Sequence, residues 1–241
     1  MINILSPFVD QLGSYAPLNE SDKAAIFSLP VSVRTFDRET QVARQGDIDS
    51  SFLVLVEGFA TRQKLTGNGR RQLLSLDLPG DPLNLSVLFL SSADYGVLAL
   101  ANAKIAFVPR QPVIELLNAH ASIMHAFFKS ALVDASITRE AVLNHGQRDA
   151  LARLAHFLCQ YVARMEARDL TSQGEFKLPF SQGQLGDATG LTAVHVNRML
   201  SRLVDAGLIT HKGRSFKILN VAALKRAGDF KDEYLFLKKP A

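Results

Sequence analysis

The sequence predicts an α+β chain with an N-terminal antiparallel β-roll of the cupin-like jelly-roll type, a long helix and a C-terminal winged helix-turn-helix. Three observations predict it. Short β-rich runs alternate with turn signals over residues 31–109, turn signals are scarce over residues 111–145, and a capped helix, a glycine and an amphipathic helix follow Ser181. The expected parts are a β-roll domain with a short N-terminal helix at 1–117, the long helix at 118–145 and the winged domain at 146–241.

Length and composition exclude several classes of protein. With 241 residues and 47% hydrophobic content, the chain is long enough to bury a core. Its apolar runs are short and interrupted by charges, which argues against a membrane span or a signal peptide. Because Cys159 is the single cysteine, an internal disulfide and cysteine-rich metal or iron–sulfur sites are excluded. We expect a cytoplasmic protein with no cofactor and no metal, in which Cys159 is a buried thiol rather than a redox switch.

Charge is unevenly distributed along the chain. Residues 1–145 contain 12 Lys and Arg against 14 Asp and Glu, whereas residues 146–241 contain 15 against 9. A basic C-terminal part joined to a slightly acidic body indicates a module that binds a polyanion.

The N-terminal part combines one helix signal with many strand signals. The segment "NESDKAAIFSLP" predicts a short helix with Asn19 or Ser21 as its N-cap and Pro30 as its stop. After it, the runs "SFLVLVEG", "RRQLLSLDL" and "KIAFVP" alternate with the turn signals "RQGD", "EG", "TGNG" and "LPGD". This spacing is typical of a compact antiparallel barrel or roll.

Turn signals are scarce over residues 111–145, and mostly apolar residues recur at steps of three and four from Ile123 to Asn144, which predicts the long helix at 118–145. Two adjoining rows give more apolar surface than one small barrel can cover, so we expect two copies of the chain to pair along this helix. From the first row, the expected interface residues are Ile123, Phe127, Asp134, Ile137 and Ala141. The second row contains Met124, Phe128, Ala131, Ala135, Thr138 and Val142. We expect Gly146 to interrupt the helix and a second amphipathic helix to follow over residues 149–165.

The stretch from Ser181 to Ile209 predicts a helix-turn-helix. Ser181 with Gln184 three residues later is a capping-box signature for the first helix. Gly190 suits the positive φ of a tight turn, and Thr192 can cap the second helix. That helix would point its N-terminal end into the major groove of DNA, and "GLITHKGRSFKIL" would form a two-stranded wing. The expected DNA-contacting residues are Ser181, Gln182, Thr192, Ala193, Val194, His195, Asn197, Arg198, Arg202, Lys212 and Arg214.

With these segments in this order, the chain resembles the CRP/FNR superfamily of bacterial transcription regulators over nearly its whole length. The matching pieces are "RQGD", "VEG", "LPGD", the long helix, "RLAHFL" and "LTAVHVNRMLSRLVDAGLI". The resemblance implies a β-roll effector domain, a dimerising helix and a winged helix-turn-helix that reads palindromic DNA. It also implies that a glutamate usually stands at the position of Val194, and that Arg198 donates to a guanine.

The sequence departs from the ligand-binding branches of that family. Where the cyclic-AMP-binding branch has Gly-Glu and Arg-Ser pairs, this chain has Asn84-Leu85 and Tyr95-Gly96. An uncharged pocket cannot neutralise a cyclic phosphate, so we do not expect cyclic AMP to bind. The cysteine cluster of the iron–sulfur branch and the β-roll histidine of the haem branch are missing as well. The expected effector pocket is Leu83, Asn84, Leu85 and Tyr95, and an empty vestige of a pocket would account for the same residues.

We therefore predict a homodimeric regulator that binds a palindromic promoter site. The expected partners are double-stranded DNA, a second copy of the chain, RNA polymerase and an unidentified small-molecule effector, with no membrane. Two alternatives stay open: a sensory module that acts through protein partners, and a regulator with a vestigial pocket controlled by its abundance. An enzyme is not expected, because the sequence offers no paired nucleophile and base, no metal-ligand spacing and no phosphate loop. The signal, the target genes and the choice between activation and repression are left open.

Overall fold

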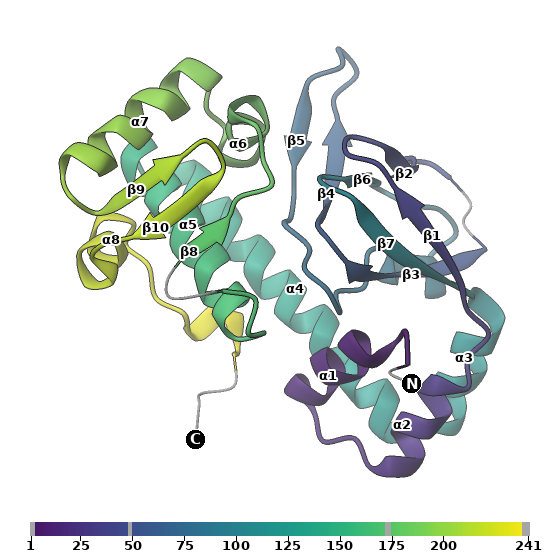
Figure 1. The fold of residues 1–241 in the computed structure, drawn as a ribbon. Coiled ribbons are helices and arrows are strands. Elements are labelled where there is room, and N and C mark those ends of the chain that lie inside the picture. The colour runs from purple at the N-terminus through teal and green to yellow at the C-terminus, as the bar shows by residue number, and fades with distance from the viewer. Residues whose placement is uncertain (1–2, 48–49, 172–174, 238–241) are drawn as a thin grey trace. The chain divides into compact units, whose positions relative to one another are not determined.

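The structure, a computed structural model, describes residues 3–47, 50–171 and 175–237. It divides into two units, Met1–Leu132 and Val133–Ala241 (Figure 1). The N-terminal unit combines helices with two β-sheets, and the C-terminal unit combines helices with one small sheet. The α+β class predicted from the sequence is confirmed.

Two helices precede the sheets of the N-terminal unit. α2 (Glu20–Phe27) begins at Asn19, the first of the two predicted caps. A complete capping box forms there, in which the Asn19 side chain accepts from the Asp22 amide and the Asp22 carboxylate accepts from the Asn19 amide. The sequence interpretation misses α1 (Ser6–Tyr15), because this helix has no side-chain cap, although Pro7 in its first turn is compatible with a helix start. α1 nevertheless buries Phe8, Val9 and Leu12.

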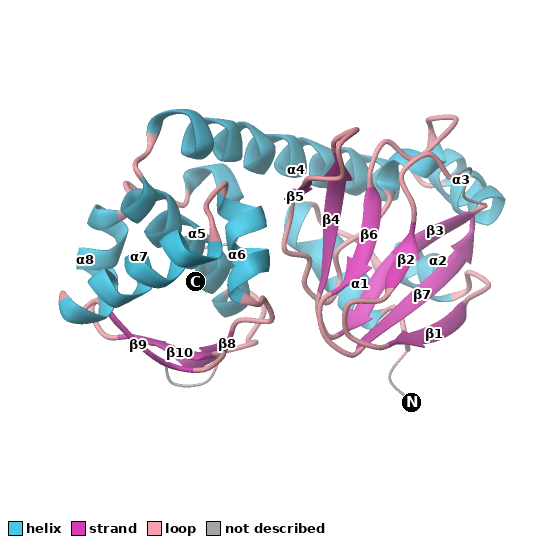
Figure 2. Ribbon diagram, turned by 90° about the horizontal axis from the view of Figure 1, so that it is seen from above, coloured by secondary structure: helices cyan, strands magenta, loops and turns pink. Residues whose placement is uncertain are grey.

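The described part of this unit contains seven strands in two antiparallel sheets, ordered β1-β7-β3 and β2-β6-β4-β5 (Figure 2). The strands are β1 (Ser32–Phe36), β2 (Gln41–Ala43), β3 (Ser51–Glu57), β4 (Ala60–Leu65), β5 (Arg71–Leu73), β6 (Gly96–Ala99) and β7 (Ala103–Pro109), and a 3-10 turn, η1 (Leu85–Leu88), follows β5. Gly58, in the "VEG" turn between β3 and β4, has a φ of +84°, and a Cβ there would collide with the Asn102 carbonyl oxygen. The predicted antiparallel roll is thus confirmed, together with the turn predicted at "EG".

The long helix expected over residues 118–145 is found as α4 (Ala121–Gln147), and a separate helix, α3 (Arg110–Ala119), precedes it. His120 separates them with an extended φ and ψ of −124° and 96°. Its imidazole lies 3.3 Å from the buried Asp22 carboxylate, and a hydrogen bond from Ser122 is the main cause that lowers the pKa of Asp22. Local sequence spacing does not predict this break, because the break depends on Asp22 of α2, which interacts with His120 and Ser122.

The side chains of the N-terminal unit form two buried clusters. One fills the roll between its sheets and includes Leu55 and Ile105. The other joins α1 and α2 to β3, α3 and the first turns of α4. In that second cluster the rings of Phe8, Phe52 and Phe127 pack with centroids 5.5–5.7 Å apart. The start of α4 is therefore part of the core of this unit.

The prediction that Gly146 interrupts the long helix is wrong, because α4 continues through it to Gln147. A glycine inside a helix costs about 1 kcal/mol relative to alanine, which the rest of a long helix can offset. The chain turns at Arg148 and Asp149, and the Asp149 carboxylate accepts from the Ala152 amide at 2.9 Å and caps α5 (Ala150–Glu166).

After α5, the C-terminal unit consists of short elements around a three-stranded sheet ordered β8-β10-β9. They are β8 (Glu175–Lys177), α6 (Gln182–Thr189), α7 (Ala193–Asp205), β9 (Ile209–Lys212), β10 (Ser215–Ile218), α8 (Val221–Ala227) and the 3-10 turn η2 (Glu233–Leu235). The predicted wing is the β9–β10 hairpin, and β8 pairs with β10 as the third strand of the sheet.

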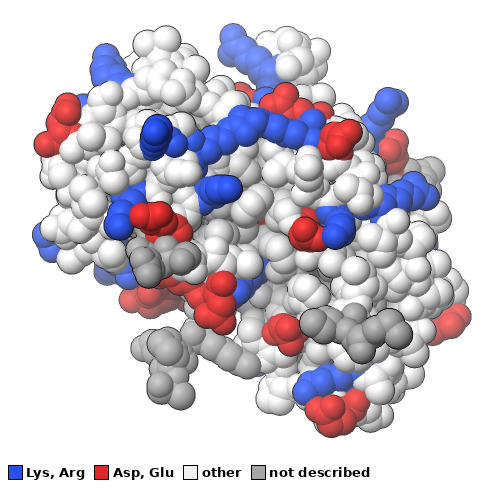
Figure 3. All heavy atoms as spheres, viewed as in Figure 1, with Lys and Arg blue, Asp and Glu red and all other residues white. Residues whose placement is uncertain are grey.

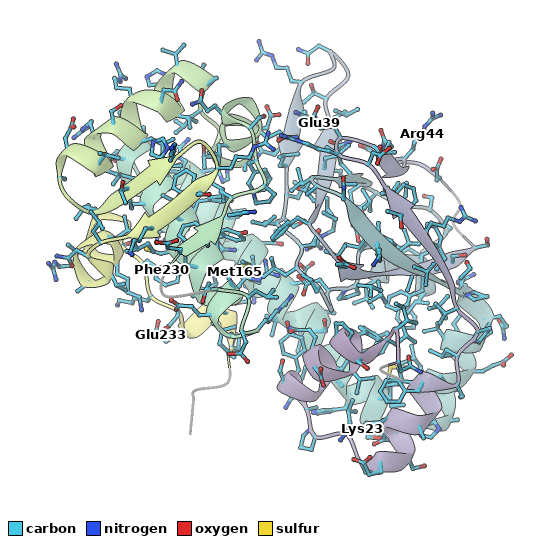
Figure 4. All side chains as sticks on the ribbon, in the orientation of Figure 1. Lys23, Glu39, Arg44, Met165, Phe230 and Glu233 are labelled. Carbon is cyan, nitrogen blue, oxygen red and sulfur yellow. The ribbon has the colours of Figure 1, made fainter. Side chains whose placement is uncertain are left out.

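A buried imidazole, that of His156 in α5, is 1% exposed. Its Nδ1 lies 3.1 Å from the Gly228 carbonyl oxygen and its Nε2 lies 2.9 Å from the Tyr234 hydroxyl. Phe230, labelled in Figure 4, packs its ring against the edge of the imidazole, with centroids 5.1 Å apart. Burial is the main cause that lowers the pKa of His156, the charge of Arg148 adds to it, and Glu140 and Asp229 act in the opposite direction.

This lowered pKa predicts that acid destabilises the C-terminal unit. Because the folded state holds His156 neutral, the unfolded chain binds more protons below the ordinary imidazole pKa of 6.5. We expect the free energy of unfolding to fall as the pH drops below that value, by up to about 1.4 kcal/mol per pH unit.

Urea unfolding of the whole chain between neutral and mildly acidic pH measures the effect. His156→Gln should remove this part of the pH dependence, whereas His125→Gln, at an exposed position of α4, should leave it. An identical pH dependence in the His156→Gln variant would contradict the assignment.

Candidate DNA interface

α6 and α7 are joined by a tight turn that uses the predicted residues. The Ser181 hydroxyl accepts from the Gln184 amide at 3.2 Å, and the Gln184 side chain accepts from the Ser181 amide at 2.8 Å. Gly190 takes the left-handed conformation that ends α6, with a φ of +66°. A second glycine, Gly186, was not singled out from the sequence; a Cβ there would collide with the Leu191 carbonyl oxygen, so the corner closes tightly only with glycine.

α7 has one buried and one exposed face. The Thr192 hydroxyl accepts from the His195 amide at 3.2 Å and caps the helix as predicted. The buried face consists of Val196, Met199, Leu200 and Leu203, of which Met199 was not predicted. The exposed face carries the residues expected to contact DNA, which are Thr192, Ala193, Val194, His195, Asn197, Arg198 and Arg202. Val194 is 78% exposed, so its side chain is accessible to a ligand of α7.

The first helix contributes to the same surface through a side-chain hydrogen bond. Asn197 Nδ2 of α7 donates to Gln182 Oε1, at the start of α6, over 2.7 Å. Both residues are exposed, and both were predicted DNA contacts, but the bond between them joins positions 15 apart and was not foreseen. It restricts the amide orientation of Asn197, so this residue presents a defined donor and acceptor to any ligand of α7.

The wing adds two cations at an exposed tip. Gly213, with a φ of +59°, turns the chain between Lys212 and Arg214, and all three residues are exposed. In the face drawn in Figure 3, Lys and Arg atoms are spread over several places in both units, with Asp and Glu atoms beside some of them. The basic character of the C-terminal unit is therefore better described as individual cations than as one continuous patch in this view.

The four residues of the expected effector pocket divide between two places. Leu83 lies fully buried in the cluster within the roll, and Tyr95 packs against the same cluster. Leu85 packs against the other cluster, beside α1 and α3. Asn84 accepts from the Leu53 amide at 2.7 Å and donates to the Ser51 carbonyl at 2.9 Å, so its amide holds β3. An effector role for these residues stays a prediction.

Two of the five expected interface residues on α4 need correction. Ile123 and Phe127 are 0% and 3% exposed, because α1, α2 and β3 cover them within a single chain. The other three, Asp134, Ile137 and Ala141, are half-buried. The large exposed apolar side chains of α4 are Phe128, Leu132, Val142 and Leu143, at 62%, 50%, 69% and 45%. Phe128 and Val142 belong to the second predicted row, whereas Leu132 and Leu143 belong to neither row, so the exposed apolar face follows the second row only in part.

Cys159 is buried in α5, and desolvation raises the pKa of its thiol to about 12. A thiol that stays protonated at neutral pH is a poor nucleophile and a poor metal ligand. Within the part of the chain that the structure describes, no group of three or more His, Cys, Asp or Glu side chains is placed to hold a metal ion.

Comparison with known families matches both units. A Crp-like helix-turn-helix domain matches residues 152–227, and a cyclic nucleotide-binding domain matches residues 33–120. The chain belongs to the CRP/FNR superfamily. Members of this family are transcription regulators, so the two matches account for both the β-roll and the winged domain.

Relatives within the CRP/FNR superfamily match most of the chain at low identity. Transcriptional activator protein FnrA of Stutzerimonas stutzeri is 25% identical over 207 residues, which cover 86% of this chain and 84% of the relative. Transcriptional activator protein FnrL of Cereibacter sphaeroides is 26% identical over 219 residues, covering 88% and 87%.

Solved structures of the family share the fold. FixK2 from Bradyrhizobium japonicum superposes with a TM-score of 0.75 and 23% identity, covering 83% of this chain and 98% of that protein. A CRP-family transcriptional regulator from Thermus thermophilus, TTHB099, gives a TM-score of 0.65 at 20% identity, covering 82% and 97%. Of the helices described, none is both long and apolar enough to span a membrane.

Proposed function

We propose that two copies of this chain bind a palindromic DNA site and thereby regulate transcription. The observation that carries the proposal is the surface of α7, whose first turns expose polar and cationic side chains while its opposite face is buried. This is the arrangement of a recognition helix, which reads base edges from its N-terminal end. Selection of bound duplexes from a random pool, followed by gel-shift titration, tests the proposal: an inverted repeat with half-sites about one helical turn apart should emerge.

The side chains of α7 suggest which bases are read. Arg198 carries a planar guanidinium suited to bidentate donation to guanine O6 and N7. Val194 has no hydrogen-bond acceptor, so it cannot select cytosine as a glutamate there would, and its methyl groups suit a thymine methyl. Asn197, oriented by Gln182, suits adenine, and Ala193 leaves one position without a polar reader.

Other residues of the interface would hold the DNA backbone. Ser181, Thr192 and His195 lie at the N-terminal ends of α6 and α7, where unpaired amides and the helix dipole favour phosphate. Arg202 of α7 and the wing residues Lys212 and Arg214 would neutralise further phosphates. These contacts would set the orientation of the protein on the DNA rather than its sequence preference.

A dimer is part of the proposal because a palindrome needs two recognition helices related by two-fold symmetry. The partner we propose is a second copy packed along α4. Its support is a set of exposed apolar side chains on α4, Phe128, Leu132 and Val142, with the half-buried Ala135 between them. Phe128, Ala135 and Val142 recur at the heptad spacing of a helix pair.

We further infer that the protein acts in the cytoplasm with RNA polymerase as a partner and catalyses no reaction, as befits a transcription regulator. For the β-roll we propose an uncharged effector, because the positions Asn84-Leu85 and Tyr95-Gly96 supply no charged side chain that could neutralise a phosphate. If the pocket is vestigial and the amount of the protein in the cell controls its activity, the purified protein will bind its DNA site without any added molecule. The rival function, a module acting through protein partners, predicts no salt-dependent affinity for duplex DNA.

Lys212→Ala tests the role of the wing. Because Lys212 is an exposed cation at the wing tip, its loss should weaken all duplexes alike and reduce the slope of log affinity against log salt by about 1. Lys217→Ala is the matched control, since Lys217 of the same hairpin is already paired with Glu175 at 3.2 Å. A change in base preference caused by Lys212→Ala, or an unchanged salt slope, would contradict this role.

A further inference from the structure

Arg153, in the first turns of α5, lies at the ends of two other helices. One terminal nitrogen, Nη2, donates to the carbonyl oxygens of His145 and Arg148, at 3.1 and 3.2 Å, where α4 ends. The other, Nη1, donates to the carbonyl oxygens of Thr189 and Gly190, at 3.0 and 3.4 Å, where α6 ends. A single guanidinium thus bonds the end of α4 to the turn that leads into α7.

The chemistry of this contact favours arginine. The last carbonyls of a helix lack intrahelical partners and carry the negative end of the helix dipole. Here one permanently charged, planar guanidinium donates to the carbonyls at two such helix ends, with Nη2 directed to the end of α4 and Nη1 to the end of α6. A lysine ammonium is a single point of charge and cannot hold both helix ends in a fixed relative orientation.

The α4 side of this contact is itself held firmly. Asn144 of α4 is 6% exposed and donates to the Arg153 carbonyl oxygen at 3.3 Å. Arg148 donates to the Asn144 side chain at 3.4 Å and pairs with Glu140 at 2.7 Å. The last turns of α4 and the first turns of α5 therefore form one hydrogen-bonded corner within the C-terminal unit.

The turn on the other side packs directly onto this corner. At Gly190 a Cβ would lie 3.1 Å from His145 Cδ2 and 3.2 Å from Arg153 Nη1, closer than most real contacts of that atom. Gly190 thus has two roles: its positive φ closes the turn, and its missing side chain lets the turn approach α4.

We propose that Arg153 is a positioning residue that fixes the orientation of the recognition helix α7 relative to the C-terminal turns of α4, and thereby the spacing of half-sites that the dimer accepts. The inference rests on the proposed function. If two chains pair along α4, the separation and angle of their α7 helices depend on how rigidly each α7 is joined to its own α4. Base reading by α7 itself does not depend on this joint.

The experiment measures affinity for a set of palindromic duplexes that carry the selected half-sites at the preferred spacing and at spacings shorter and longer by one or more base pairs. A second set keeps the spacing and replaces the guanine assigned to Arg198. For Arg153→Lys we expect the preference for the best spacing to fall by about fivefold or more, the range of a typical coupling between sites, while the guanine preference stays at its wild-type ratio.

Two further variants sharpen the test. Asn144→Ala releases the same corner from the α4 side and should shift the spacing preference in the same direction, which keeps the proposal testable if Arg153→Lys folds poorly. Arg226→Lys makes the same substitution at an exposed position of α8 and should change neither preference.

The inference is overturned if Arg153→Lys and Asn144→Ala keep the wild-type spacing preference, or if they weaken every duplex by the same factor, which would mark a merely structural role. It is also overturned if the wild type reads the guanine but accepts all spacings equally. Failure of the proposed function can be distinguished from failure of this inference, because in that case the wild-type protein itself selects no palindrome.

Discussion

We expect Phe128→Asp to convert the proposed dimer into monomers. Phe128 is 62% exposed on α4 and begins the apolar row that continues through Leu132 and Ala135 to Val142. In the proposed dimer these side chains are buried against their copies, and a carboxylate buried there without a partner costs several kcal/mol. We expect the dissociation constant to rise by a factor of about 100 or more, as about 2.7 kcal/mol or more requires. Sedimentation equilibrium of the whole chain measures it.

Two neighbouring positions serve as controls. Lys129→Asp places an acidic side chain at an exposed position outside the row, so the dimer should persist. Phe127→Asp should instead lower the free energy of unfolding by several kcal/mol, because Phe127 packs between Phe8 and Phe52 in the core of its own chain. A wild-type protein that is already a monomer at micromolar concentration, or a Phe128→Asp variant that stays dimeric, would contradict the proposed dimer interface on α4.

Phe127 and Phe128 also show which features of the fold can be predicted from the sequence. Both rows of α4 are mostly apolar, so helical periodicity predicts two faces that need covering but does not say what covers each. The answer depends on α1, which packs on Phe127 and whose own start lacks a cap signal. The choice of the first row as the interface was wrong at Ile123 and Phe127 because the covering helix was not predicted.

Features fixed by neighbouring residues were predictable. The capping boxes at Asn19 and Ser181, the cap at Thr192 and the positive φ of Gly190 are all found in the structure. Each depends on residues three positions apart or fewer, so a local pattern contains the whole signal. The break at His120, the Gln182–Asn197 bond and the bonds from Arg153 to the Thr189 and Gly190 carbonyls depend on residues distant in sequence, and these were not predicted.

Arg198→Ala will cost about 1–3 kcal/mol of binding free energy at the preferred site and will relax the preference for one guanine in each half-site. Arg198 is exposed on the N-terminal half of α7, and its guanidinium can donate to guanine O6 and N7 together. Arg198→Lys keeps the charge but loses the planar fork, so it should retain affinity for non-specific duplex while losing most of the guanine preference. Gel-shift titration against duplexes with each base at that position measures both quantities.

Arg202→Ala and Val194→Glu separate base reading from charge on the same helix. Arg202 lies one turn beyond Arg198, where we assign a phosphate contact, so its loss should weaken all duplexes alike. Val194→Glu adds an acceptor where the wild type presents only methyl groups, and it should move preference toward cytosine at one symmetric pair of positions. If Arg198→Ala binds as selectively as the wild type, or if the wild type already prefers cytosine at the Val194 position, α7 does not read DNA in this register.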